Sequence, residues 1–392
     1  MQRAVNGLDS SEGGIQIRGM NSREVGSSKH KFLSHLKKLG ICQDVKTIEE
    51  RSSCPGFLGF QLRDVRSNDW APLGDTSKLC QKLNLKTQTN SGDLEREILL
   101  AMLLCPVPFQ FPNFDELTSS VRIRMNIVEA ARKTSLAFAT DEAERPAEFW
   151  TYDDERGFIL RPGKSLITAL QRATQPEESG KRYTFSCRRA AEYIVLLGVA
   201  SEAIVCNKEL FQNLHRQAET RAIKGSEFER VFLRQIGSLS NPLPLRFFVP
   251  GDRTWFRNPD KSSSEITGYE GSWTFYLGAG LFADFWRPNQ IYSLTSKCLS
   301  IYHWRNSTYR DPNGELQIDE QRVENLVETM TGDSAATDQV LGEMLQLQEP
   351  MNTSSGGCIE AHREYPRQIC RGTSDLVLPD IHPNGQTFAK LN

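Results

Sequence analysis

The first half of the chain carries apolar residues at helical spacing. Residues 92–104 and 121–138 each have the pattern of an amphipathic helix. An apolar stretch over 193–200 predicts a third helix, which begins at Cys187 and ends near Asn207. The sequence therefore predicts a largely helical first half.

The pattern changes after the Pro-rich turn that ends at Pro244. Short runs of aromatic and β-branched residues follow, divided by Pro-Gly and Gly turn signals. A helical half followed by a stranded half is typical of the α+β class rather than of alternating α/β folds. The predicted strands cover residues 246–249, 253–256, 273–277 and 280–286.

Composition shifts divide the chain into four predicted segments. The first is polar and too poor in apolar residues to offset its ordering entropy, and the last is rich in Gly, Ser, Thr, Pro and Asn. Three prolines in residues 105–112 mark a boundary between the middle two. The prediction is a disordered tail (1–30), a helical region (31–110), a main domain (111–330) and a mostly disordered tail (331–392), with one short helix near 338–348.

Charge and cysteine content bear on partners and compartment. The 47 Lys and Arg nearly balance the 49 Asp and Glu, so we expect neither nucleic acid nor a membrane surface as a partner. Nine dispersed cysteines favour a reducing, cytoplasmic setting. The start of the chain lacks the apolar segment of a Sec signal peptide, and its Ser-rich character is compatible, as an alternative, with export through a needle-type secretion system.

Cys187 is the residue that most strongly suggests chemistry. Unpaired N–H groups at a helix start favour the thiolate, and Arg188 and Arg189 add positive charge nearby. Together with Arg182, these arginines could also form a basic face that attracts an acidic protein. The alternative interpretation is a small cysteine that simply packs in the core.

Five stretches between residues 120 and 309 have the order and spacing of landmarks in a known enzyme family. In that order the chain resembles the bacterial protein-glutamine gamma-glutamyltransferases, the small sporulation-type transglutaminases. The stretches are Asn126–Ala131; Phe149-Trp150 with Gly157–Pro162; Tyr183–Cys187 with Ala190; Pro250–Asp252 with Trp255–Asp260; and Tyr269–Trp273 with Tyr276–Gly278.

The resemblance implies a papain-like cysteine enzyme, in which a nucleophile helix packs on an antiparallel sheet. It implies that Cys187 attacks a glutamine carboxamide, releases ammonia and passes the acyl group to a lysine amine. The implied partners are therefore protein substrates, with no cofactor.

Three positions depart from the family pattern. Ser186 and Ser272 stand where the family has glutamates, and Phe285 stands where it has a histidine. Because a thiol nucleophile needs a titratable partner, a substitute has to be sought nearby. The candidates are Glu270, two residues before Ser272; Asp284, beside Phe285; and His303, on a following apolar segment.

Two further alternatives remain open from the sequence. A glutamine deamidase would use the same thioester, whereas a catalytically silent relative would keep the fold to bind a protein. We predict no metal site, because the zinc-type residues near the C-terminus have loose spacings and no Cys-x-x-Cys pair. These residues are Cys358, His362, Cys370 and His382.

Overall fold

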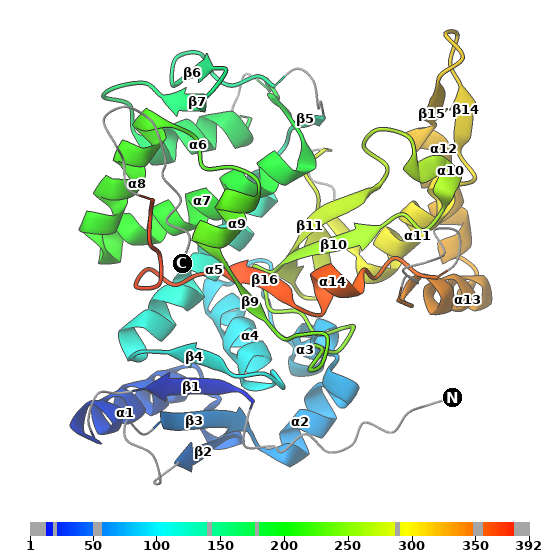
Figure 1. Cartoon of the computed structure of the whole chain (residues 1–392). Helices are drawn as coiled ribbons and strands as arrows, with labels where there is room; N and C mark the ends of the chain where they lie inside the picture. Colours follow the sequence, from blue (N-terminus) through cyan, green and yellow to red (C-terminus); the bar gives the residue numbers. More distant parts are fainter. Residues whose placement is uncertain are drawn as a thin grey trace.

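The computed structural model describes residues 13–18, 22–49, 57–138, 143–176, 180–286, 291–347 and 356–379. Helices and strands are both abundant, as the sequence predicts, and two long helices lie at the centre of the molecule (Figure 1). These are α5 (Phe114–Lys133) and α7 (Cys187–Cys206). The predicted extent of the helix that begins at Cys187 is confirmed.

A four-stranded sheet forms the N-terminal part of the chain, at the bottom of Figure 1. Its strand order is β2-β3-β1-β4, in which β1 runs parallel to β4 and the other pairs are antiparallel. The elements here are β1 (Ile15–Arg18), α1 (Ser22–Lys38), β2 (Val45–Glu49), β3 (Phe57–Leu62), α2 (Asp64–Trp70), α3 (Leu79–Leu83), α4 (Ser91–Leu103) and β4 (Phe109–Phe111).

This sheet differs from the prediction of a disordered tail over 1–30 and a purely helical region over 31–110. Ile15 and Ile17 of β1 are fully buried, and α1 already begins at Ser22. The segment is ordered because β1 pairs with β4, a strand inside the Pro-rich stretch almost a hundred residues later. Such a long-range pairing leaves little local signal in the sequence. Residues 1–12 lie outside the described residues.

Helices α5 and α7 pack very closely where they cross. Gly198 of α7 makes this possible, because a Cβ atom there would lie 2.5 Å from Ile127 Cγ1 and 3.3 Å from the Ile123 carbonyl oxygen. Around this pair lie further elements: β5 (Ala137–Phe138), β6 (Trp150–Asp153), β7 (Gly157–Leu160), α6 (Leu166–Thr174), β8 (Thr184–Phe185), α8 (Lys208–Thr220), α9 (Ser226–Phe232) and β9 (Leu233–Ile236).

An antiparallel sheet, β10-β11-β12-β13, stands beside α7. Its strands are β10 (Arg253–Arg257), β11 (Gly271–Gly278), β12 (Leu281–Ala283) and β13 (Ile291–Ser293). Side chains alternate between its two faces. Phe275 and Leu277 pack into the main core with α7, whereas Tyr276 and Phe282 pack into a second core on the opposite face. Three of the four predicted strands thus lie in this sheet, and residues 246–249 form no strand.

The second core is covered by the C-terminal part of the chain. The remaining elements of the chain are α10 (Lys261–Ser264), α11 (Leu294–Trp304), β14 (Thr308–Arg310), β15 (Leu316–Ile318), α12 (Glu320–Thr331), α13 (Ser334–Met344), α14 (Ala361–Glu364) and β16 (Arg367–Cys370). Of these, β16 pairs with β9, and its Ile369 belongs to the main core. Here the structure departs from the prediction of a mostly disordered tail over 331–392. Val340, Met344 and Ile359 are buried in the second core, which anchors an otherwise polar segment. Residues 380–392 lie outside the described residues.

The Pro250–Asp252 stretch is buried where α5, β16 and the start of β10 meet. Asp252 accepts hydrogen bonds from Arg124 of α5 (2.7 Å), from Arg367 of β16 (3.2 Å) and from the Val249 N–H (3.0 Å). Gly251 has a φ of 90° and packs against the Arg124 backbone, so a side chain would be strained there. The motif therefore fixes the start of β10 relative to α5.

Candidate active site around Cys187

Cys187 is the first residue of α7, immediately after the short strand β8. Ser186 caps the helix, because its side-chain oxygen accepts the Arg189 N–H. Arg145 holds the strand in place: it donates to the Thr184 carbonyl (2.8 Å) and its guanidinium lies 3.2 Å from the Phe185 ring centroid. The thiol thus lies at the turn between β8 and α7, whose position these contacts fix.

The surroundings of the thiol act on its pKa in opposite directions. Burial raises the pKa of Cys187, and the Glu270 carboxylate raises it further, whereas backbone N–H groups of Arg188, Cys187 itself and Trp273 lower it. The net pKa lies above the ordinary value of 9.0. The expected bias toward thiolate from the helix start is therefore outweighed by burial.

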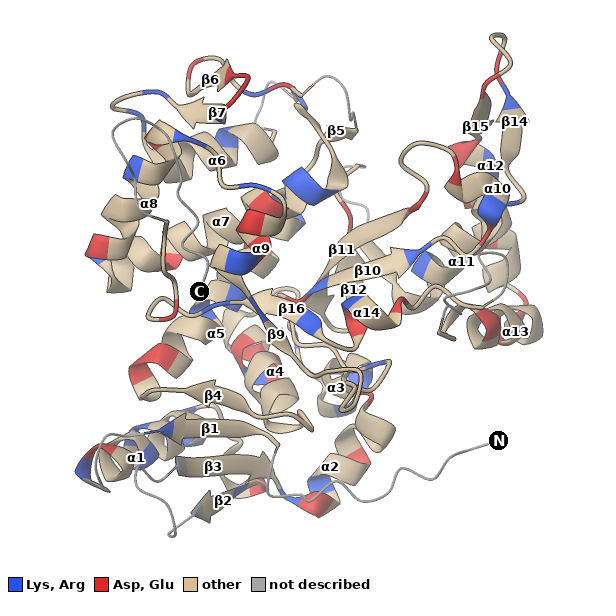
Figure 2. Ribbon diagram, in the orientation of Figure 1, with Lys and Arg blue, Asp and Glu red and all other residues tan. Residues whose placement is uncertain are grey.

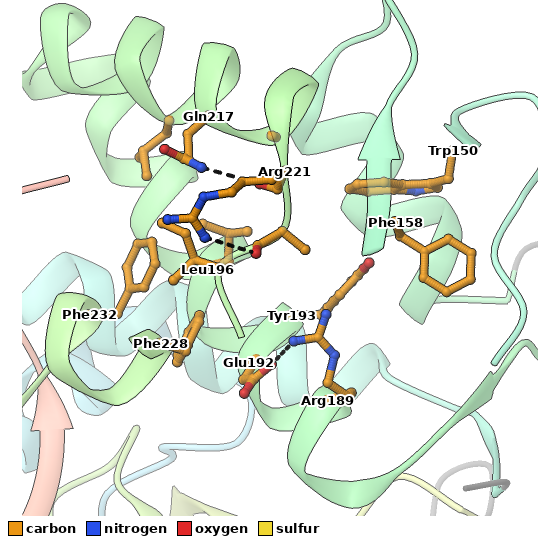
Figure 3. A pocket seen from close by; sticks show the side chains of 14 residues that line it. Trp150, Phe158, Arg189, Glu192, Tyr193, Leu196, Gln217, Arg221, Phe228 and Phe232 are labelled. Carbon is orange, nitrogen blue, oxygen red and sulfur yellow. Dashed lines mark hydrogen bonds and ion pairs between the residues drawn. The ribbon is translucent and has the colours of Figure 1, made fainter. Parts of the chain in front are cut away.

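The neighbouring arginines do not supply the positive charge expected from the sequence. Arg188 pairs with Glu229 of α9 at 3.3 Å. Arg189 turns away and pairs with Glu192, beneath Tyr193 in a small apolar pocket of about 50 Å³ (Figure 3). Each guanidinium therefore pairs with a carboxylate rather than with the thiol.

The Trp273 N–H can act on the Cys187 sulfur because β12 ends before it would pair with Trp273. In β11, the Tyr276 N–H donates to Asp252 and the Glu270 carbonyl accepts from Asn258, so even-numbered residues pair with the β10 side. The Trp273 N–H consequently faces the β12 side, where the strand has already ended at Ala283. This backbone donor could not be identified from the sequence.

Of the three predicted partners, Glu270 is the one whose charge acts on the thiol, and it raises the thiol pKa. Its side chain is exposed, and its Oε2 accepts the Gly268 N–H at 3.1 Å. The residue immediately precedes β11, which explains why strand alternation does not fix its direction. Its negative charge acts on the Cys187 thiol, which makes it the candidate proton acceptor among the three.

Asp284 and His303 lie elsewhere. Asp284 is buried and forms an ion pair with Lys297 of α11 at 3.0 Å, so it faces the second core. His303 is buried in α11, where its Nδ1 contacts Asn306 at 3.1 Å and burial lowers its pKa. The structure does not bring either residue to Cys187.

The positions that depart from the family pattern have structural roles. Ser272 is buried and lies opposite Phe256 in the sheet register. Phe285 is fully buried against Phe275, with ring centroids 6.0 Å apart. Neither side chain titrates near neutral pH.

A charged cavity of about 260 Å³ adjoins the nucleophile turn. It is lined by Arg188, Glu229, Arg253, Trp273, His362, Arg363 and Gln368. Arg253 is 5% exposed and lies 4.2 Å from the Trp273 ring centroid. The last three lining residues come from α14 and β16, far along the chain. Figure 2 shows blue Lys and Arg segments around this junction of α9, β10 and β16.

Within the described ranges, no three His, Cys, Asp or Glu side chains gather as metal ligands would. Cys358 is instead buried beside the Cys298 thiol, and His382 lies outside these ranges. None of the helices described here combines the length and hydrophobicity needed to cross a bilayer.

A family model and one relative match this chain within a single enzyme family. A family model described as protein-glutamine gamma-glutamyltransferase matches residues 75–300, which is more than half of the chain. A protein-glutamine gamma-glutamyltransferase of Halalkalibacterium halodurans is 25% identical over 193 residues, which cover 45% of this chain and 58% of that relative. The chain thus spans less than two thirds of the relative's length. A solved transglutaminase from Geobacillus stearothermophilus, without its C-terminal extension, matches 55% of this chain and 98% of its own at 22% identity, with a TM-score of 0.38.

Proposed function

Because the chain belongs to the protein-glutamine gamma-glutamyltransferase family, we propose that it transfers the acyl group of a protein glutamine to a primary amine through a thioester on Cys187. The observation that carries this proposal is the surroundings of the thiol. Three backbone N–H groups and one carboxylate, that of Glu270, act on a single sulfur at a helix start.

The first half-reaction needs a proton acceptor. As Cys187 Sγ attacks the glutamine carbonyl carbon, the thiol proton passes to the Glu270 carboxylate, and the carbonyl oxygen becomes an oxyanion. We assign stabilisation of that oxyanion to the Cys187 and Trp273 N–H groups, because both act on the thiol and backbone donors serve this role in acyl transfer. The C–N bond then breaks, Glu270 returns its proton to the leaving nitrogen, and ammonia departs.

The second half-reaction reverses these roles. A primary amine attacks the thioester carbonyl and gives a proton to Glu270, the C–S bond breaks, and an isopeptide bond forms. The proton then returns to the sulfur. Water in place of the amine would give glutamate, which is deamidation by the same route.

The proposal includes a papain-like arrangement of the core. Its support is that α7 begins at the nucleophile and packs on β11 of an antiparallel sheet. The protein substrates, a glutamine donor and an amine acceptor, follow from the same chemistry. A cytoplasmic setting stays the prediction from cysteine content.

Incorporation of a fluorescent primary amine into casein, measured in parallel with ammonia release, tests the activity. We expect the native chain to incorporate the amine and Cys187→Ala to incorporate none. Ammonia without incorporation would replace transfer by deamidation. Inactivity of the folded native chain toward both casein and a panel of glutamine peptides would favour a silent binding relative.

A further inference from the structure

We propose that the cavity beside Cys187 binds an acidic side chain of the donor protein, so that the preferred glutamines are flanked by Asp or Glu. This inference rests on the transferase function proposed above and names the substrate class. The cavity shares Trp273 with the nucleophile's surroundings, and it contains Arg188, the residue next to Cys187. A side chain held there would therefore belong to the same peptide segment as the reacting glutamine.

The charges around the cavity leave a positive surplus. Arg188, Arg253 and Arg363 line it, and the carboxylate among the lining residues is Glu229. Nearby, Glu192 is held by Arg189, and Glu360 by Arg363 at 3.2 Å. Among the lining residues, three guanidiniums thus face one carboxylate, which favours an incoming anion.

Arg253 supplies a buried donor that no described residue satisfies. Its side chain is 4% exposed, and its Nε–H has no acceptor within the described part of the chain. Its other end is fixed, because Nη2 donates to Glu229 at 3.3 Å and the guanidinium stacks on Trp273. The Arg253 guanidinium is thus a fixed, buried positive charge in the cavity wall, and such a group pairs readily with a carboxylate.

The contacts of Glu229 indicate that the Arg188 and Arg253 guanidiniums are arranged to hold a carboxylate. Its Oε1 lies 3.3 Å from nitrogens of both Arg188 and Arg253. The two guanidiniums are therefore already arranged around one carboxylate oxygen. An acidic side chain entering the cavity would meet the same pair together with Arg363.

The far wall of the cavity is formed by residues of the C-terminal segment of this chain. His362, Arg363 and Gln368 follow the matched family region, which ends at residue 300. They are held in place by the pairing of β16 with β9 and by Glu364, which accepts the Trp255 N–H at 2.7 Å. The segment thus adds a binding wall to a family core.

The test uses peptides with one glutamine and a single varied neighbour, Asp, Asn or Lys, placed on either side. We expect kcat/KM for ammonia release to favour Asp over Asn by about 10-fold at one of these positions, the size of a partly exposed charge-assisted contact. Arg363→Gln should reduce this ratio by about 3-fold, and Arg363→Glu should make Lys preferred over Asp. Arg322→Gln, an exposed arginine on α12, should leave the ratio unchanged.

Binding of the same peptides to Cys187→Ala separates this inference from the transferase proposal. Tighter binding of the Asp peptide, lost in the Cys187→Ala/Arg363→Glu double variant, supports the cavity even if the native chain proves inactive. Equal binding and equal kcat/KM for all three peptides at every position would overturn the inference and leave the transferase proposal intact.

Discussion

The Glu270 carboxylate and the Cys187 thiol interact between the start of β11 and the start of α7, and the carboxylate raises the thiol pKa. One negative charge therefore makes the thiolate less stable at rest, yet it is the acceptor that we propose for the thiol proton. The two effects act on activity in opposite directions.

Glu270→Gln separates them. The variant should lower the pKa of Cys187, because a nearby negative charge is removed, and should lower kcat/KM by about 100-fold, because the proton acceptor is lost. The pKa is measured from the pH dependence of iodoacetamide alkylation, followed by mass spectrometry of the Cys187 peptide. A lower pKa with unchanged or raised activity would show that Glu270 is only an electrostatic neighbour.

Gly198 allows α5 and α7 to approach each other closely, and a larger residue there should separate them. Gly198→Ala should lower the free energy of unfolding by about 1–2 kcal/mol, since the clash with Ile127 outweighs the better helix propensity of alanine. Gly342→Ala is the matched control: it lies in helix α13 with no atom within 4 Å of the added Cβ, and it should stabilise the protein slightly. Equal effects in urea unfolding would mean that the helix crossing is looser than described.

Glu97 of α4 ties the N-terminal region to the sheet. Its carboxylate accepts hydrogen bonds from Thr87 (2.6 Å), the Tyr276 hydroxyl (3.2 Å) and the Ala279 N–H (2.8 Å). Glu97→Ala leaves these buried donors unsatisfied, so we expect a loss of about 2–4 kcal/mol. Glu95→Ala removes a half-exposed contact with His35 and should cost less than about 1 kcal/mol. Similar urea midpoints for the two variants would argue against this joint.

Glu364 should make stability depend on pH. Burial raises its pKa from 4.5 to about 7, so the folded state holds the proton more tightly than the unfolded chain. Its contribution to stability is therefore present at low pH and is lost as pH rises from about 4.5 to about 7.

Glu364→Gln keeps an acceptor for the Trp255 N–H and removes the titration. Relative to the native chain, this variant should gain stability as the pH is raised from 5 to 8, measured by urea unfolding at each pH. A constant difference across that range would contradict the raised pKa.

The sequence predicted the elements with strong local signals and missed those made by distant contacts. The helix from Cys187 was predictable because Ser186 precedes a long apolar stretch. The ordered C-terminal segment was not, since α12 and α13 are mostly polar and depend on a few buried residues such as Val340 and Met344.

The groups of the candidate site also fall into those that the sequence could nominate and those that depend on distant contacts. Side chains near Cys187 in sequence, and Glu270 through the family pattern, could be nominated in advance. The Trp273 N–H is a backbone group, and Arg363 reaches the site only because β16 pairs with β9, more than 130 residues earlier. Neither has a sequence signature.

The role of Cys187 as nucleophile is tested most directly with a peptide in which the glutamine is replaced by its diazoketone analogue. A nucleophilic thiol displaces dinitrogen from this group and forms a stable thioether. We expect the native chain to be modified at Cys187, peptide mapping to find no other modified cysteine, and Cys187→Ala to remain unmodified. Modification of a different cysteine, or equal modification of folded Cys187→Ala, would contradict the assignment of Cys187 as the acyl-accepting nucleophile.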